Sequence, residues 1–291
     1  MNGFLVIDKP SGMTSHDVVA KIRKRFGTKR VGHAGTLDPM ATGVLVIGIG
    51  NATKLLQYIV DGAKSYEATI ALGAATHTDD KEGDVISVAD SSVLKVITEE
   101  LIKDGLASFV GNIQQKPSSV SAIKIDGKTA HQRVREGEVV DLPARAVTIS
   151  KIDVLSIEYL EQAILVRVIV DCSAGTYIRA IARDLGNLLK VGGHLTSLRR
   201  TLVSPFDLSE AGGIEEAEII DTTDGIGRVL PVRALSFEEM SEISFGRSIS
   251  ANLKDGIFAA LSPSGSFAAL VENKDSGGKA VAAPKLVAVQ E

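Results

Sequence analysis

The sequence contains few cysteine and aromatic residues. One cysteine, Cys172, occurs among the 291 residues, tryptophan is absent, and aromatic residues make up only 4%. A single cysteine cannot form a disulfide within the chain, and this usage is typical of proteins from a reducing compartment. We therefore expect a cytoplasmic protein.

Long apolar runs are also absent. No stretch reaches the ~18 consecutive apolar residues that a membrane-spanning helix needs. The opening residues, MNGFLVIDKPSG (1–12), have no basic segment before their short apolar run, so they do not predict a signal peptide. With 44% hydrophobic and 23% charged residues, the composition is that of an ordinary globular protein. We expect no membrane partner.

The usual motifs of metal and nucleotide-cofactor sites are missing. None of the five histidines pairs with another at i,i+4 spacing, and no cysteine cluster exists, which argues against structural zinc. Gly48 and Gly50 begin a G-x-G-x-x-G pattern, but Thr53 occupies its last glycine position. We expect no metal and no cofactor. An enzyme that binds a nucleotide through residues 48–51 is the weaker alternative.

Basic residues are concentrated near the N-terminus, although the net charge is −4. Residues 1–60 contain eight lysines and arginines against three acids, whereas residues 207–291 contain seven against fourteen. Because a local field can outweigh the net charge, the N-terminal segment is suited to attract phosphates. A solvated helix face explains the same residues about equally well.

Apolar periodicity and turn residues predict strands that alternate with helices. The clearest helix begins after Thr14 and Asp17, which form a capping box ahead of Val18, Val19 and Ile22. The other predicted helices are 53–58, with Thr53 as its N-cap, 92–109, and one within 173–189 after a tight turn. The predicted strands are 4–8, 44–50, 65–73, 164–172 and 193–206, and residues 76–84 form a polar loop.

Two segments differ from the rest of the chain in residue composition and pattern. Residues 112–145 are predicted to form an inserted, mobile finger, whose basic residues are Lys124, Lys128, His131, Arg133 and Arg135. The tail, 231–291, has short apolar runs separated by glycine turns, which is typical of a small β-barrel or sandwich. At roughly 100–200 residues per domain, we expect a main domain over 1–230 and a second one over 231–291.

One carboxylate, Asp38, lies in a turn of small and apolar residues. The proline that follows it restricts the turn, and Gly35 and Gly43 allow the backbone to approach another group closely. Apolar neighbours would partly exclude water, so the carboxylate would need a cationic partner to stay ionised. From the pattern alone, an Asx contact that stabilises the turn is the simpler explanation.

A resemblance to a known family favours a functional role for Asp38 over a turn-stabilising one. The segment GHAGTLDPMATGVL (32–45) closely resembles the catalytic motif of the bacterial tRNA pseudouridine synthase B (TruB) family, in which the aspartate of G-T-L-D-P is essential. Four more segments resemble motifs of that family in the same order, over residues 3–208. They are LVIDKPSGMTSHDVV (5–19), KSYEATIALG (64–73), CSAGTYIRAIARDLG (172–186) and LTSLRRTLVSPF (195–206).

The resemblance implies an α+β pseudouridine synthase fold. Its expected parts are a mixed, mainly antiparallel sheet, an inserted finger and a small C-terminal β (PUA-like) domain that binds RNA. The tail itself is acidic, which does not favour contact with phosphates. The implied partner is the T-arm of tRNA, bound by a monomer.

The resemblance also implies the reaction. A uridine in the T-loop of tRNA, at position 55, is flipped out of its stack. Its glycosidic N1–C1′ bond is cut, the base rotates, and C5 joins C1′. No group or electron is lost, which fits the lack of cofactor motifs.

The implied site residues follow from the matched motifs. Asp38 would act as a nucleophile at C1′ or as a base at C2′, Tyr66 would stack on the base, and Arg179 would keep Asp38 ionised. The expected substrate-binding residues are His33, Tyr177, Leu198, Lys9 and Lys54. A tRNA-binding or RNA-folding module whose chemistry is secondary or lost is the alternative from another class of protein.

Overall fold

The computed structural model describes residues 2–120, 124–125, 127–130, 133, 136, 138 and 140–288. Two basic residues of the predicted finger, His131 and Arg135, lie outside the described residues. Of Lys124 only the backbone is described. Among the described residues, no helix is long and apolar enough to cross a membrane.

One large sheet forms the main body of the molecule. Its strands follow the order β14-β1-β3-β12-β4-β11-β10-β7, with β2 beside β3 and β13 beside β12. Neighbouring strands run antiparallel, except that β12 runs parallel to β3. The strands are β1 (Gly3–Lys9), β2 (Val31–His33), β3 (Thr42–Ile49), β4 (Lys64–Leu72), β7 (Gly111–Gln115), β10 (Arg145–Tyr159), β11 (Ile164–Cys172), β12 (Gly193–Val203), β13 (Phe206–Asp207) and β14 (Ile220–Asp221).

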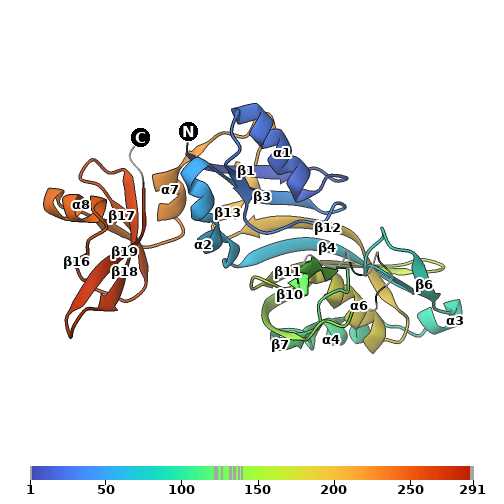
Figure 1. Cartoon of the computed structure of the whole chain (residues 1–291). Coiled ribbons are helices and arrows are strands. Elements are labelled where there is room, and N and C mark those ends of the chain that lie inside the picture. The colour runs from blue at the N-terminus through green and yellow to red at the C-terminus, as the bar shows by residue number, and fades with distance from the viewer. Residues whose placement is uncertain are drawn as a thin grey trace.

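Helices cover both faces of this sheet, and the alternation of β1 explains how. Leu5 and Ile7 point to the face covered by α1 (Ser15–Phe26), and Phe4 and Val6 point to the face near α2 (Leu56–Val60). The remaining α-helices of the described chain are α3 (Ser91–Leu94), α4 (Glu99–Ala107), α6 (Ile178–Leu188), α7 (Thr222–Gly227) and α8 (Phe237–Ser244). Figure 1 shows α6 and α4 together beside β7, β10 and β11.

A second sheet lies at the C-terminal end, in the order β15-β17-β18-β19-β16. Its strands are β15 (Val232–Ala234), β16 (Ile249–Ser250), β17 (Ile257–Leu261), β18 (Phe267–Asp275) and β19 (Ala280–Val287). Ala259 and Leu270 of this sheet share an apolar cluster with Phe4 and Val46 of the large sheet. In Figure 1, α7 lies between the two sheets.

Short hairpins complete the chain. β5 (Ala74–Thr76) pairs with β6 (Val85–Val88), and β8 (Lys124–Ile125) pairs with β9 (Lys128–Thr129). The ends of the predicted finger meet in the large sheet, because Gln115 of β7 pairs with Arg145 of β10. The finger therefore leaves and re-enters the body at one place.

Two predicted helices are wrong in detail. The predicted helix over 92–109 is two separate helices, α3 and α4. Thr98 is the N-cap of α4, because its side chain accepts a hydrogen bond from the amide of Leu101. The β-branched run 96–98 also disfavours a continuous helix. Thr53 caps nothing: it lies within the 3₁₀ helix Gly50–Lys54 and donates to the carbonyl of Gly50.

Candidate active site

The loop that carries Asp38 connects β2 to β3, and hydrogen bonds from two buried side chains fix its backbone. The Nζ of Lys9 donates to the carbonyls of Met13, at 2.6 Å, and Pro39, at 3.3 Å. The hydroxyl of Ser15 accepts from the amide of Leu37 at 2.9 Å and donates to its carbonyl at 3.1 Å. These bonds hold the backbone on both sides of Asp38.

A second buried cation holds the same loop from β12. The guanidinium of Arg200 donates to the carbonyls of Val44, at 2.8 Å, and Gly35, at 3.0 Å. This contact depends on Gly43, whose φ is +98° and whose added Cβ would lie 2.1 Å from the carbonyl oxygen of Arg200. The parallel pairing of β3 with β12 thus brings Arg200 under the loop.

Asp38 forms a two-point ion pair with Arg179 of α6. The Nε of Arg179 lies 3.0 Å from Oδ2 of Asp38, and its Nη2 lies 3.3 Å from Oδ1. The Arg179 side chain is 6% exposed, whereas that of Asp38 is 33% exposed. The carboxylate is therefore held firmly on one side and open on the other, as a group that meets a substrate must be.

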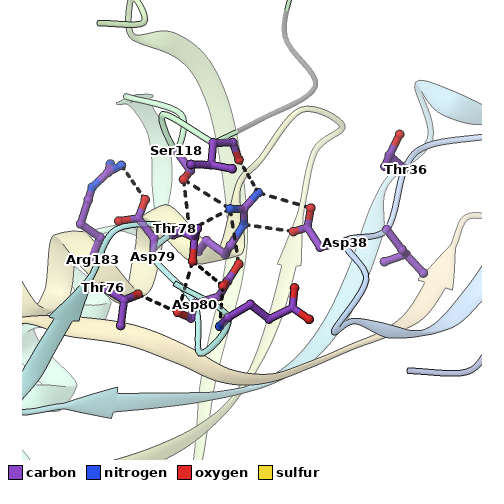
Figure 2. A network of polar contacts seen from close by, with 12 residues as sticks. Thr36, Asp38, Thr76, Thr78, Asp79, Asp80, Ser118 and Arg183 are labelled. Atoms are coloured by element: carbon purple, nitrogen blue, oxygen red, sulfur yellow. Dashed lines mark hydrogen bonds and ion pairs between the residues drawn. The ribbon is translucent and has the colours of Figure 1, made fainter. Parts of the chain in front are cut away.

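The Arg179 guanidinium also binds groups that are far away in the sequence. It donates to the carbonyls of Thr78, at 2.8 Å, and Val120, at 2.9 Å, and its Nη1 lies 3.5 Å from Oδ2 of the buried Asp80. Figure 2 shows this network around the carboxylates of Asp38 and Asp80. A buried cation at the start of a helix opposes the helix dipole, and the two carboxylates compensate for it.

A pocket of about 270 Å³ opens above Asp38. Tyr66 of β4 and Leu198 of β12 line it, and both are almost fully buried. Burial raises the pKa of the Tyr66 hydroxyl, while the nearby Arg200 guanidinium opposes that rise. Lys64 also lines the pocket, and burial lowers the pKa of its amine to about 8.

Five of the eight predicted site residues meet in this pocket. They are Asp38, Tyr66, Tyr177, Arg179 and Leu198. They come from the loop before β3, from β4, from the start of α6 and from β12, so only the folded sheet brings them together.

The other three predicted residues lie elsewhere. Lys9 is fully buried beneath the Asp38 loop, which gives it a structural task. His33 lies in β2, edge-to-face with His16 at 5.6 Å, and burial lowers its pKa. Lys54 lines a separate cavity of about 350 Å³ beside Phe267 of the C-terminal sheet.

Several residues that surround Arg179 were not identified from the sequence. Asp79 and Asp80 belong to a segment expected to be an ordinary polar loop, yet both are buried. Ser118 is fully buried beside Arg179, at 3.4 Å, and Arg183 binds Asp79. The density of threonine and aspartate in 76–80 was the available signal, but nothing local indicated burial.

The site has the parts of an acid–base or nucleophilic centre. Within the described ranges, no group of three histidine, cysteine or acidic residues is placed to hold a metal ion. A carboxylate fixed by arginine faces an aromatic ring and an apolar side chain. This arrangement can hold a planar base and act on an atom next to it.

Known families match most of the chain. The family described as "TruB family pseudouridylate synthase (N terminal domain)" matches residues 23–178. The families described as "tRNA pseudouridylate synthase B C-terminal domain" and "tRNA Pseudouridine synthase II, C terminal" match residues 179–223 and 230–283.

Relatives match along nearly the whole chain. A protein named "tRNA pseudouridine synthase B" from Corynebacterium diphtheriae is 52% identical over 278 residues, which cover 94% of this chain and 93% of that protein. A protein of the same name from Arthrobacter sp. (strain FB24) is 50% identical over 295 residues, covering 96% and 95%.

Solved structures share the fold. A chain in "Structure of H/ACA RNP bound to a substrate RNA containing 2'-deoxyuridine" superimposes with a TM-score of 0.70 at 23% identity, covering 98% of this chain and 85% of that one. A chain in "Crystal Structure of a Cbf5-Nop10-Gar1 Complex" gives 0.69 at 25% identity, covering 98% and 84%. The predicted fold class is confirmed.

The fold and the matching families define the class of this protein as a pseudouridine synthase, which is an isomerase. Within that class, the chain belongs to the TruB family of pseudouridylate synthases.

Proposed function

We propose that this protein converts a uridine of tRNA to pseudouridine, and that its target is position 55 in the T-loop. The relatives' names support tRNA as the substrate. The observation that carries the proposal is the ion pair of Asp38 and Arg179 in one pocket with Tyr66 and Leu198. The T-loop position rests on the motif resemblance of residues 32–45.

The reaction assigns a task to each of these groups. The uridine leaves its stack, at a cost of a few kcal/mol, and its base lies against the ring of Tyr66. Asp38 acts at the sugar, as a nucleophile at C1′ or a base at C2′. The N1–C1′ bond breaks, the C5–C1′ bond forms, the C5 hydrogen leaves as a proton, and N1 gains a proton. No electron is exchanged and no cofactor is required.

The wider arrangement of the molecule belongs to the same proposal. The main domain, 1–230, carries the chemistry, and its finger, about 112–145, closes on the T-arm. The small domain, 231–291, is a PUA-like module that touches RNA. The protein acts as a monomer in the cytoplasm, with no membrane partner. Tyr177 binds substrate in the pocket, Lys9 acts through the loop that it supports, and His33 and Lys54 contribute to RNA binding outside the pocket.

Tritium release tests the activity and the role of Asp38 together. The substrate is tRNA with 5-tritiated uridine, because joining C5 to C1′ must expel the C5 hydrogen. We expect release by the wild type and none above background by Asp38→Asn, although the variant still binds tRNA. No release by a folded wild type that binds tRNA would contradict the proposal and favour an RNA-folding module.

The target position needs its own control. A tRNA transcript with cytidine in place of uridine 55 keeps all other uridines. We expect release to disappear with this transcript. Undiminished release would reject the T-loop position while leaving the synthase activity in place.

A further inference from the structure

Two arginines of α6 hold the segment that leads into the finger. Arg183 donates from Nη2 to the carbonyl of Lys116 at 2.7 Å, and Arg179 donates from Nη2 to the carbonyl of Val120 at 2.9 Å. Because the two arginines are four residues apart, they lie on one side of the helix. Gln115, at the start of the segment, exchanges two hydrogen bonds with the main chain of Tyr177. We call residues 115–120 the stem.

The same arginines also hold the acidic turn, residues 78–80. The Nη1 of Arg183 lies 3.3 Å from Oδ2 of Asp79, and Arg179 contacts the carbonyl of Thr78 and the carboxylate of Asp80. Figure 2 shows Arg183 and Asp79 facing each other at the edge of the network that reaches Asp38. One layer of contacts therefore joins α6, the stem and the acidic turn.

The backbone of Asp79 indicates that this turn is held under constraint. Its φ of +61° lies in the left-handed region, which only a few per cent of non-glycine residues adopt. Such conformations persist where the surrounding structure fixes them, and they gather at functional sites. The Asp79 side chain is 11% exposed, so its pairing with Arg183 is shielded from solvent far more than a surface ion pair.

We propose that Arg183 and Asp79 form a positioning pair that fixes the stem and the acidic turn around Arg179, and so keeps Asp38 aligned for the reaction. The inference rests on the proposed function. Neither residue lines the pocket, so neither is expected to touch the base. Their effect passes through Arg179, which donates hydrogen bonds to carbonyls of the stem and of the acidic turn and directs its fork at Asp38.

This role predicts a loss of rate without a loss of binding. If the acidic turn shifts, Arg179 loses the Thr78 carbonyl and Asp80, and its fork is no longer fixed. A misplacement of about 1 Å at a reacting group can cost on the order of 10²-fold in rate. The RNA-binding surface would be unchanged.

The chain offers variants that preserve the fold. Asp79→Asn keeps the size of the side chain, and asparagine also tolerates the left-handed region. Arg183→Gln removes the other partner, and in Asp79→Asn the arginine still has Asp184 at 2.8 Å. The matched control is Arg228→Gln, which removes an ion pair to Glu210 at 2.7 Å on the other side of the sheet.

The experiment measures single-turnover tritium release at saturating tRNA, the Kd for tRNA and the Tm. For Asp79→Asn, Arg183→Gln and the double variant we expect a rate that is slower by about 10- to 100-fold, and a Kd for tRNA close to that of the wild type. The double variant should be no slower than the slower single variant, because both changes remove the same ion pair. Arg228→Gln should match the wild type.

Three outcomes would overturn the inference. They are an unchanged rate in a folded single variant, a slower rate explained entirely by weaker tRNA binding, and losses that multiply in the double variant. If one variant fails to fold, the other still decides. An inactive wild type would instead reject the proposed function, so the two failures are distinguishable.

Discussion

At the scale of the residue, the fork of Arg179 explains how one aspartate is held in a fixed orientation beside the pocket. The guanidinium bonds two oxygens of Asp38 and two carbonyls, which no other cationic side chain can do in one plane. The carboxylate therefore keeps one orientation while it stays open to the pocket.

Arg179→Lys should separate charge from geometry. A lysine ammonium keeps the positive charge but cannot bind Asp38 at two points and hold both carbonyls. We expect tritium release to fall by about 10²-fold, with tRNA affinity little changed. Full activity in Arg179→Lys would show that charge alone supports Asp38 and would reject the role of the fork.

Lys64 gives a pH-dependent test of the pocket. Its amine donates to the carbonyls of Val60 and Gly62, and burial lowers its pKa from 10.5 to about 8. Between pH 8 and 10.5 the unfolded chain binds more protons than the folded one, so the contribution of Lys64 to stability rises with pH. At pH 7 the folded protein bears the full cost of the buried charge.

Thermal unfolding of Lys64→Met measures this effect. We expect the Tm of Lys64→Met, relative to wild type, to be higher at pH 7 than at pH 9.5, because the wild type gains stability over that range. The exposed Lys95→Met is the control and should show no such trend. A difference between Lys64→Met and wild type that is constant from pH 7 to 9.5 would contradict the assignment.

At the scale of the element, the parallel pairing of β3 with β12 supports the loop that carries Asp38. The two strands pair in parallel through Gly43 and Arg200. This contact places a buried arginine under the Asp38 loop, and it leaves no room for a side chain at position 43.

Gly43→Ala should therefore damage stability and activity together. The added Cβ would meet backbone atoms of Arg200, the nearest at 2.1 Å, and alanine would also disfavour the φ of +98°. We expect a loss of about 2 kcal/mol or more in the free energy of unfolding in urea. Gly256→Ala is the control, because its φ is +115° but nothing lies within 4 Å. Equal losses at both positions would show that only φ matters.

The elements also show what could be predicted from sequence. The capping box of Thr14 and Asp17 is confirmed, since its signal is contained in four residues. The strands 4–8, 44–50 and 164–172 are confirmed as β1, β3 and β11, because buried strands appear as apolar runs. The 15-residue β10 was not predicted, since most of its residues are exposed. The short α8 was also missed, although Ser236 and Glu239 form a capping box at its start.

The residues of the site likewise divide into those that a local motif predicts and those that only the folded structure reveals. Asp38, Tyr66 and Arg179 were found because each lies in a recognisable motif. The acidic turn was missed because Thr78 and Arg179 are 101 residues apart, and their contact exists only after the sheet has closed. Burial of two aspartates in a polar segment is a tertiary property that local composition does not reveal.

At the scale of the whole molecule, charge is distributed unevenly along the chain. The exposed basic residues of α1 face solvent in one stretch, and the C-terminal sheet lies in an acidic segment. An RNA substrate contributes one negative charge per phosphate, so its binding should depend on which end of the molecule it meets.

Charge reversal can identify the surface that meets phosphates. Lys21 and Lys24 of α1 are exposed, and Lys274 and Lys279 near the C-terminal hairpin are equally exposed. The double variants Lys21→Glu/Lys24→Glu and Lys274→Glu/Lys279→Glu change the net charge by the same amount. They differ only in where the charge is placed.

The measurement is the Kd for tRNA over a range of salt concentrations. If α1 meets phosphates, Lys21→Glu/Lys24→Glu should weaken binding and lower the slope of log K against log salt by about one per lost contact. The C-terminal pair should leave both quantities near those of the wild type. Equal weakening by the two pairs would mean that only net charge matters, and a wild-type affinity that is flat with salt would remove α1 from the RNA-binding surface.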